Sequence, residues 1–250
     1  MEPWLLALLA GLVAGGALLL GSAIGWFVKV PAAVVAAIMA FGAGVLISAL
    51  TLELVSDAMD QGGLVSTAGG FLAGAVIYVG LNILLARRGA RHRKRSGDLQ
   101  TSEEEQSGSG GAIAIGALLD GVPESMVLGL SVLVGPGLSV PMFAAVFISN
   151  LPEGLSSSAG WKSAGRSRRY VFGIWGAIAL ASGLASLAGF VLLDGAAPAT
   201  LAVVNALAAG AILAMITDTM IPEAFAKDSL YTGLLATLGF LAALTLHAMG

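Results

Sequence analysis

Cysteine is absent from the 250 residues of this chain. The protein can therefore form no disulfide and no thiolate metal site, so metal ligands would have to be oxygen atoms, imidazoles or methionine thioethers. Histidine is nearly absent as well, with only His92 and His247. These absences leave the redox compartment open and restrict any metal site to a mostly oxygen-based one.

Charged residues are also scarce. They make up 11% of the sequence, against about 25% in soluble domains, while 57% of the residues are hydrophobic. The mean hydropathy is +0.93. This composition predicts a membrane protein, in which the position of each charge matters more than the net charge of -3.

Long apolar stretches run along the whole chain. The hydrocarbon core of a bilayer is about 30 Å thick, so about 20 apolar residues cross it as a helix. We expect an all-α, polytopic membrane protein, with eight transmembrane helices in one bundle and residues 1–250 in a single transmembrane domain. The first stretch lacks the pattern of a signal peptide, so we expect it to be retained. The expected spans are 4–27, 31–56, 64–86, 112–134, 140–162, 170–193, 199–226 and 230–249.

Lysine and arginine occupy alternate connections between these spans. Cytoplasmic connections collect basic residues, and all 12 of them here follow odd-numbered spans. The distribution predicts eight spans with both termini outside, in the cell membrane, or in the inner membrane if the protein is bacterial. The basic residues are Lys29, Arg87, Arg88, Arg91, Arg93, Lys94, Arg95, Lys162, Arg166, Arg168, Arg169 and Lys227.

One connection, at residues 87–111, is much longer than the others. It begins basic, turns acidic at Glu103 to Glu105 and ends in glycine and serine. This composition predicts a flexible cytoplasmic loop. We interpret its "RHRKR" run as a lipid-facing, topogenic cluster and expect no nucleic-acid partner. His92, alone among like charges, is interpreted as a solvated residue more readily than as a metal ligand.

Three predicted spans contain a polar-x-x-Pro-Glu unit: "DGVPES" at 120–125, "SNLPEG" at 149–154 and "TMIPEA" at 219–224. Its first and last positions lie one turn apart on one helix face. A charge at the bilayer centre costs about 2.5 to 3.5 kcal/mol on insertion scales, so such a residue normally faces a partner or a polar pathway. The proline removes one backbone hydrogen bond, which predicts a bend and a free carbonyl beside the carboxylate.

Glu124 and Glu153 fall near the middle of consecutive antiparallel spans, joined by a short connection. We expect them to face each other at similar depth. Two neighbouring glutamates repel unless a proton or another cation lies between them. No lysine or arginine falls within the core of a predicted span, so a mobile cation, either a proton or a metal ion, is the expected counter-charge.

"DGVPES" and "SNLPEG" on consecutive helices resemble the signature of the ZIP (Zrt/Irt-like protein) family of divalent-metal transporters. The eight spans, outward termini and long loop after the third span are similar as well. In that family the fourth helix carries His-Asn-x-Pro-Glu-Gly and the fifth His-x-x-Pro-Glu-Gly, which together form a metal site that is often binuclear. The resemblance implies that Glu124 and Glu153 are bridging metal ligands and that Asn150 is the variable polar ligand. The metal ion would be the transported substrate, with no prosthetic group.

The sequence departs from the family pattern at both histidines. Asp120 stands at the first histidine position, Gly121 at the adjacent asparagine and Ser149 at the second histidine. The expected site is therefore harder and richer in oxygen, which shifts preference from Zn²⁺ toward Mn²⁺, Fe²⁺ or Mg²⁺, and it holds fewer ligands for a second ion.

Two further pairs of carboxylates are candidates. "DTMIPEA" resembles a motif common in bacterial members of the family, and Asp218 and Glu223 in it would lie near the cytoplasmic end as exit ligands or as interfacial charges. Glu53 and Asp57, one turn apart near the outer end, would guide cations inward or belong to a solvated helix end. The expected metal ligands are Asp120, Glu124, Ser149, Asn150, Glu153, Asp218 and Glu223.

Transport of divalent cations such as Zn²⁺, Mn²⁺ or Fe²⁺ into the cytoplasm is the leading functional hypothesis. A proton-coupled carrier of a non-metal solute, or a membrane sensor that retains the fold, is the alternative. An intramembrane enzyme is disfavoured because no span contains HExxH or a Ser-His pair. The expected partners are divalent cations and the lipid bilayer, and a homodimer is an open possibility.

Overall fold

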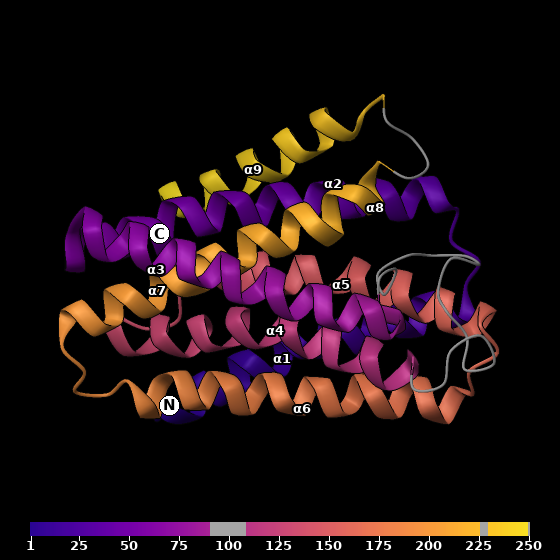
Figure 1. Ribbon diagram of the computed structural model, residues 1–250, viewed down its shortest axis with the longest axis horizontal. Coiled ribbons are helices and arrows are strands. Elements are labelled where there is room, and N and C mark those ends of the chain that lie inside the picture. The colour runs from indigo at the N-terminus through magenta and orange to yellow at the C-terminus, as the bar shows by residue number, and fades with distance from the viewer. Residues whose placement is uncertain (91–108, 226–229, 250) are drawn as a thin grey trace.

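The computed structural model describes residues 1–90, 109–225 and 230–249, and in these ranges all regular structure is helical (Figure 1). Most helices run along the long axis of the molecule. Three short π-helical segments, η1, η2 and η3, extend or interrupt them. The elements are α1 (Pro3–Phe27), α2 (Ala32–Ala49), η1 (Leu50–Val55), α3 (Ser56–Leu85), η2 (Ala86–Ala90), α4 (Ser109–Val134), α5 (Val140–Ser163), α6 (Arg168–Leu192), α7 (Pro198–Met215), η3 (Ile216–Met220), α8 (Ile221–Ala224) and α9 (Thr232–Met249).

Helix ends follow local sequence signals. α1 and α7 begin with a proline in the first turn, where its missing N–H costs nothing. The hydroxyls of Ser139 and Ser167 cap α5 and α6, each accepting a backbone N–H bond of 3.2 Å. Gly63, at φ 68°, and Gly89, at φ 95°, interrupt the helical run from Ala32 to Ala90, because this left-handed backbone is accessible chiefly to glycine.

Six helical segments in the described ranges are long and apolar enough to cross a membrane. α5 is not among them because its second half is rich in serine and carries Glu153. Every residue from 152 to 158 of α5 is buried, so other parts of the protein, rather than lipid, surround these polar side chains. The prediction of an all-helical, multi-pass membrane protein is confirmed. The six segments are Pro3–Phe27, Ala32–Ala90, Gly111–Val134, Arg168–Leu192, Pro198–Ala224 and Thr232–Met249.

Glycines bring pairs of helices into backbone contact. A Cβ atom added to Gly154 of α5 would overlap the carbonyl of Leu18 in α1, and one at Gly129 of α4 would overlap Ser186 of α6. Gly74 of α3 meets Leu207 of α7 in the same way. These contacts show that small residues let the helices pack closely, as is usual for helices in lipid.

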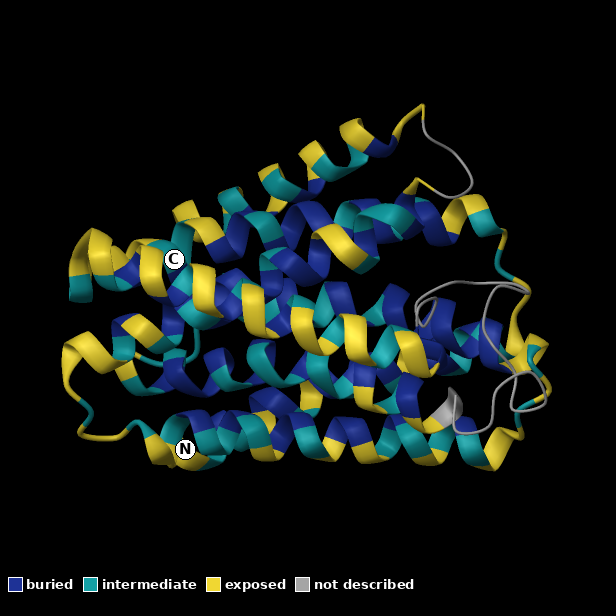
Figure 2. Cartoon of the chain, viewed as in Figure 1, coloured by how far each residue is buried: buried dark blue, intermediate teal, exposed yellow. Residues whose placement is uncertain are grey.

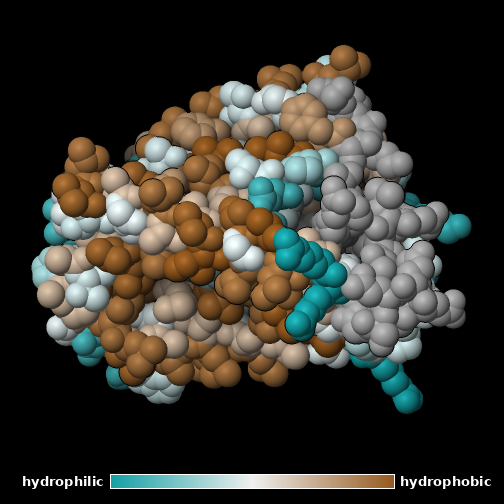
Figure 3. Space-filling model, viewed as in Figure 1, coloured by the Kyte–Doolittle hydropathy of each residue, from teal (hydrophilic) through white to brown (hydrophobic). Residues whose placement is uncertain are grey.

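On the face shown in Figure 3, apolar residues predominate among the described residues, and hydrophilic ones lie at the left-hand edge and right of centre. Both chain termini lie toward the same end of the long axis (Figure 1). Buried positions gather on the sides of the helices that face one another, while exposed positions follow the outer faces (Figure 2). This distribution is that of a bundle exposed to lipid around its circumference.

Two expectations differ from the structure in detail. The predicted loop at 87–111 overlaps described elements at both ends, because η2 extends to Ala90, with non-helical backbone at Arg88 and Gly89, and α4 begins at Ser109. His92, the "RHRKR" run and Glu103 to Glu105 lie outside the described residues, as does Lys227. The helical backbone also continues through Pro123 and Pro152. Departures from α-helix occur instead in η1 and η3, since a helix can lose one proline N–H bond without being interrupted.

Candidate metal centre

Asp120 and Glu124 of α4 are both buried, each only 2% exposed. They lie one turn apart, so the spacing of the motif places both carboxylates on the same helix face. The hydroxyl of Tyr78 in α3 donates a hydrogen bond of 2.6 Å to Oδ1 of Asp120. The hydrogen bond from Tyr78 in α3 therefore fixes Asp120, which lies on the same face of α4 as Glu124.

The α5 motif is buried as well, with Glu153 at 6% exposure. Ser149 donates its hydroxyl proton to the carbonyl of Val146 in its own helix, at 3.0 Å. The side-chain amide of Asn150 donates to the carbonyl of Ala14 in α1, at 2.9 Å. In this arrangement the Asn150 amide nitrogen anchors α5 to α1, and Ser149 is bonded locally.

One face of α5 carries Ser149, Glu153 and Ser156, because they are spaced four and three residues apart. The hydroxyl of Ser156 donates to Oε1 of Glu223 in α8, at 3.3 Å. Glu223 is 4% exposed, so it is a buried carboxylate beside the α5 motif. This contact brings the third Pro-Glu unit to the helix that carries the second.

Asp218 is placed differently. It is exposed and belongs to the π-helical segment η3, and it accepts a hydrogen bond of 3.0 Å from the amide of Asn82 in α3. Tyr78 and Asn82 lie one turn apart, so one face of α3 supplies a donor to Asp120 and another to Asp218. π-Helical turns are frequent at functional sites.

The structure limits how many of these groups can share one ion. Within the described ranges, no three histidine, aspartate or glutamate side chains lie close enough together to hold a metal ion. At most two of the predicted carboxylates can therefore coordinate the same ion in this arrangement, and its other ligands would be neutral oxygens, thioether sulfur or water. Met220 and Ser149 both lie beside Gly42 of α2, whose missing side chain leaves room there.

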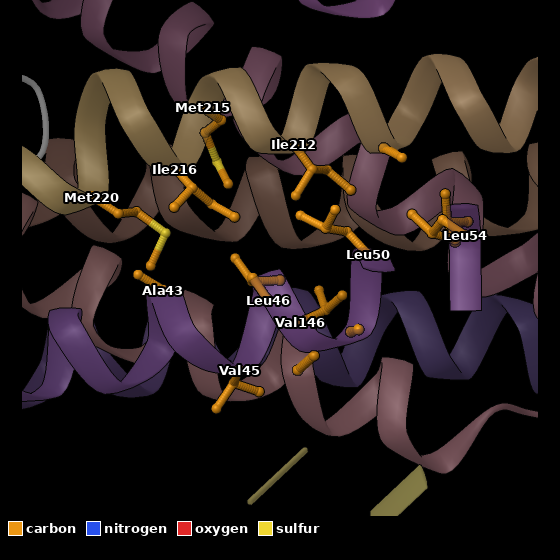
Figure 4. Packing of buried hydrophobic residues seen from close by; sticks show 14 of the residues in the cluster. Ala43, Val45, Leu46, Leu50, Leu54, Val146, Ile212, Met215, Ile216 and Met220 are labelled. Atoms are coloured by element: carbon orange, nitrogen blue, oxygen red, sulfur yellow. The ribbon is translucent and has the colours of Figure 1, made fainter. Parts of the chain in front are cut away.

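Toward the end of the bundle where both chain termini lie, an apolar layer covers the α4 and α5 motifs. On α4 the next turn on the face of Glu124 presents Val127, and on α5 the turn before Ser149 presents Val146; both are buried. Figure 4 shows Leu46, Leu50, Val146 and Ile212 pointing toward one another from α2, η1, α5 and α7. We call this set the apolar layer: Leu46, Leu50, Val127, Val146 and Ile212.

Tyr78 and Ser156 are the two residues of this region that sequence reasoning missed. Tyr78 was marked only by its spacing of four residues from Asn82 in an otherwise apolar span, and Ser156 by the run of serines after Glu153. Neither signal says which partner the side chain meets, because each partner lies in a helix distant in sequence.

Comparison with known proteins adds no assignment, because the chain matches no family model and no curated protein sequence.

Proposed function

We propose that this protein is a transporter that carries divalent metal cations into the cytoplasm through a carboxylate site on α4 and α5. The substrate is Zn²⁺ or another transition metal such as Mn²⁺ or Fe²⁺. The proposal includes eight membrane spans, a cell-membrane location, or the inner membrane if the protein is bacterial, and both termini outside.

The burial of Asp120, Glu124 and Glu153 carries this proposal. All three are at most 6% exposed and lie well inside the long helices α4 and α5. Ionisable groups at this depth are costly and normally mark an ion or proton pathway. Carboxylate, amide and hydroxyl oxygens suit hard divalent cations better than soft ones, which favours Mn²⁺ or Fe²⁺ over Zn²⁺.

Transport follows from exposing such a site to one side of the membrane at a time. The carboxylates replace part of the hydration shell of the ion, and one group of helices rocks against the other. In the present arrangement the apolar layer separates the motifs from the outer end, whereas Ser156 and Glu223 continue the polar face of α5 toward the other end. The proposed path therefore runs from the apolar layer past Glu124 and Glu153 to Glu223.

Uptake into proteoliposomes tests the function directly. We expect Glu124→Gln and Glu153→Gln to lower uptake of the preferred ion by at least about tenfold, which corresponds to about 1.4 kcal/mol of lost stabilisation. Glu2→Gln, at an exposed position, is the matched control. A panel of Zn²⁺, Mn²⁺, Fe²⁺, Co²⁺, Cd²⁺ and Mg²⁺ identifies the substrate. Uptake of every ion at the native rate in both buried variants would show that the site is misplaced.

A proton-coupled carrier of another solute, or a membrane sensor, is the second candidate. It is favoured by the absence, within the described ranges, of any group of three acidic or histidine side chains that could hold a metal ion. Titration calorimetry with the same ions separates the two candidates. Saturable binding of an ion supports the transporter, and the lack of any binding supports the alternative.

A further inference from the structure

A small cavity lies toward the outer end of the bundle, on the far side of the apolar layer from Glu124. Its volume is about 20 Å³, enough for one water molecule or one ion. Five helical segments contribute polar or thioether groups to its wall, and the rest of the wall is apolar. These groups are Glu53 of η1, Asp57 of α3, Ser131 of α4, Met142 of α5 and Asn205 of α7.

Asn205 is the most informative of these residues. It is 2% exposed and lines the cavity, yet its side chain has no hydrogen-bond partner among the described residues. A buried amide without a partner costs about 1 to 3 kcal/mol, so such groups normally meet water or a ligand. Its carbonyl oxygen is a suitable ligand for a hard cation.

Glu53 provides a second group that is ready to bind. Its Oε2 accepts a hydrogen bond of 2.5 Å from the hydroxyl of Ser139, which fixes the orientation of the carboxylate. Its Oε1 is buried and accepts no hydrogen bond, and His247 Nδ1 lies 3.7 Å away, within ion-pair distance when the imidazole is protonated. One oxygen is thus held by Ser139, and the other can bind a cation when His247 is neutral.

The cavity lies in line with the predicted pathway. On α4, Ser131 is seven residues beyond Glu124, which places it on the same face and about 10 Å further along the axis. On α5, Met142 is seven residues before Ser149 in the same way. Val127 and Val146 of the apolar layer occupy the intervening turns. The cavity and the motifs therefore lie at successive levels of the bundle, on the same faces of α4 and α5.

We propose that this cavity, which we call the outer site, binds one divalent cation through Glu53, Asp57 and Asn205. Two carboxylates and an amide oxygen form a hard ligand set, and water completes the coordination. The outer site holds the ion before the apolar layer opens toward Glu124. Its role in uptake rests on the proposed transport function, whereas binding at the outer site does not.

Mn²⁺ binding to the purified full-length protein in lipid nanodiscs, followed by electron paramagnetic resonance, tests the site. In a Glu124→Gln background, which disables the inner motif, we expect saturable Mn²⁺ binding to remain. Adding Glu53→Gln or Asn205→Leu should weaken that binding at least tenfold, whereas Asp194→Asn, at an exposed acid outside the cavity, should leave it unchanged. Elution of each variant as a single species on size exclusion shows that it is folded.

Uptake measurements then connect the outer site to transport. We expect Glu53→Gln alone to raise the Mn²⁺ concentration for half-maximal uptake about tenfold, with the maximal rate kept within about twofold. The outer site would be overturned if the residual Mn²⁺ binding stayed unchanged in Glu53→Gln and Asn205→Leu. It would also be overturned if the Glu124→Gln protein bound no Mn²⁺. Binding that depends on Glu53 in a protein without metal uptake would instead support the outer site and reject the transport function.

Discussion

The hydroxyl of Tyr78 in α3 donates a hydrogen bond of 2.6 Å to Oδ1 of Asp120 in α4, and both residues are at most 2% exposed. The bond joins helices that are separated in sequence by the long segment at 91–108. It also fixes the residue that stands where the resemblance places a histidine. Tyr78 therefore positions a predicted ligand without itself belonging to a Pro-Glu motif.

Replacing Tyr78 by phenylalanine should destabilise the protein. The ring keeps its packing, but Asp120 loses a buried donor, and a hydrogen bond to a charged group contributes about 1.5 to 3 kcal/mol. We expect a thermal midpoint lower by several degrees, measured by intrinsic fluorescence in detergent. Tyr231→Phe, at a site 62% exposed, is the control and should melt like the native protein. Equal midpoints for both variants would mean that the bond to Asp120 adds no stability.

Replacing Asp120 by histidine should move ion preference toward Zn²⁺. Imidazole is a softer ligand than carboxylate, and a change of about 1.4 kcal/mol in relative binding would alter the Zn²⁺ to Mn²⁺ uptake ratio about tenfold. Competition between the two ions in proteoliposomes measures this ratio. Asp194→His, at an exposed position between α6 and α7, controls for added histidine. A ratio that stays the same in both variants would place Asp120 outside the coordination sphere.

Adding a methyl group at Gly154 should disrupt the contact between α1 and α5. In Gly154→Ala the new Cβ would overlap the carbonyl of Leu18, and overpacking costs about 1 to 3 kcal/mol. We expect a lower thermal midpoint and less monodisperse protein on size exclusion. Gly176→Ala is the control, because a Cβ there meets nothing within 4 Å. If Gly154→Ala were as stable as Gly176→Ala, the close approach of these helices would be wrong.

The cysteine-free chain allows its orientation to be tested with single cysteines. Asp194 is exposed between α6 and α7, and Lys29 is exposed between α1 and α2. With the basic connections inside, Asp194→Cys should react with a membrane-impermeant maleimide in intact cells, and Lys29→Cys only after permeabilisation. The labelling ratio between the two sites should reverse if the termini face the cytoplasm.

Sequence alone determined that this is a helical membrane protein and where most of its helices lie. Hydrophobic length is a local property, so the apolar stretches of the sequence coincide with long helices, whereas the predicted division into eight spans stays a prediction, because Ala32–Ala90 forms one run of 59 residues that Gly63 interrupts. The motif carboxylates Asp120, Glu124 and Glu153 were also identified, because an acid within an apolar stretch is conspicuous, and the structure buries all three.

Only the tertiary structure decided which groups meet. Tyr78 binding Asp120, Ser156 binding Glu223 and Asn150 binding the carbonyl of Ala14 are contacts between helices far apart in the chain. Helix periodicity shows which residues share a face, but not which face of another helix lies opposite. That choice depends on how the glycine-mediated helix pairs pack, which is a property of the whole bundle. For the same reason, the cavity between Glu53 and Asn205 could not be read from either residue's neighbours in sequence.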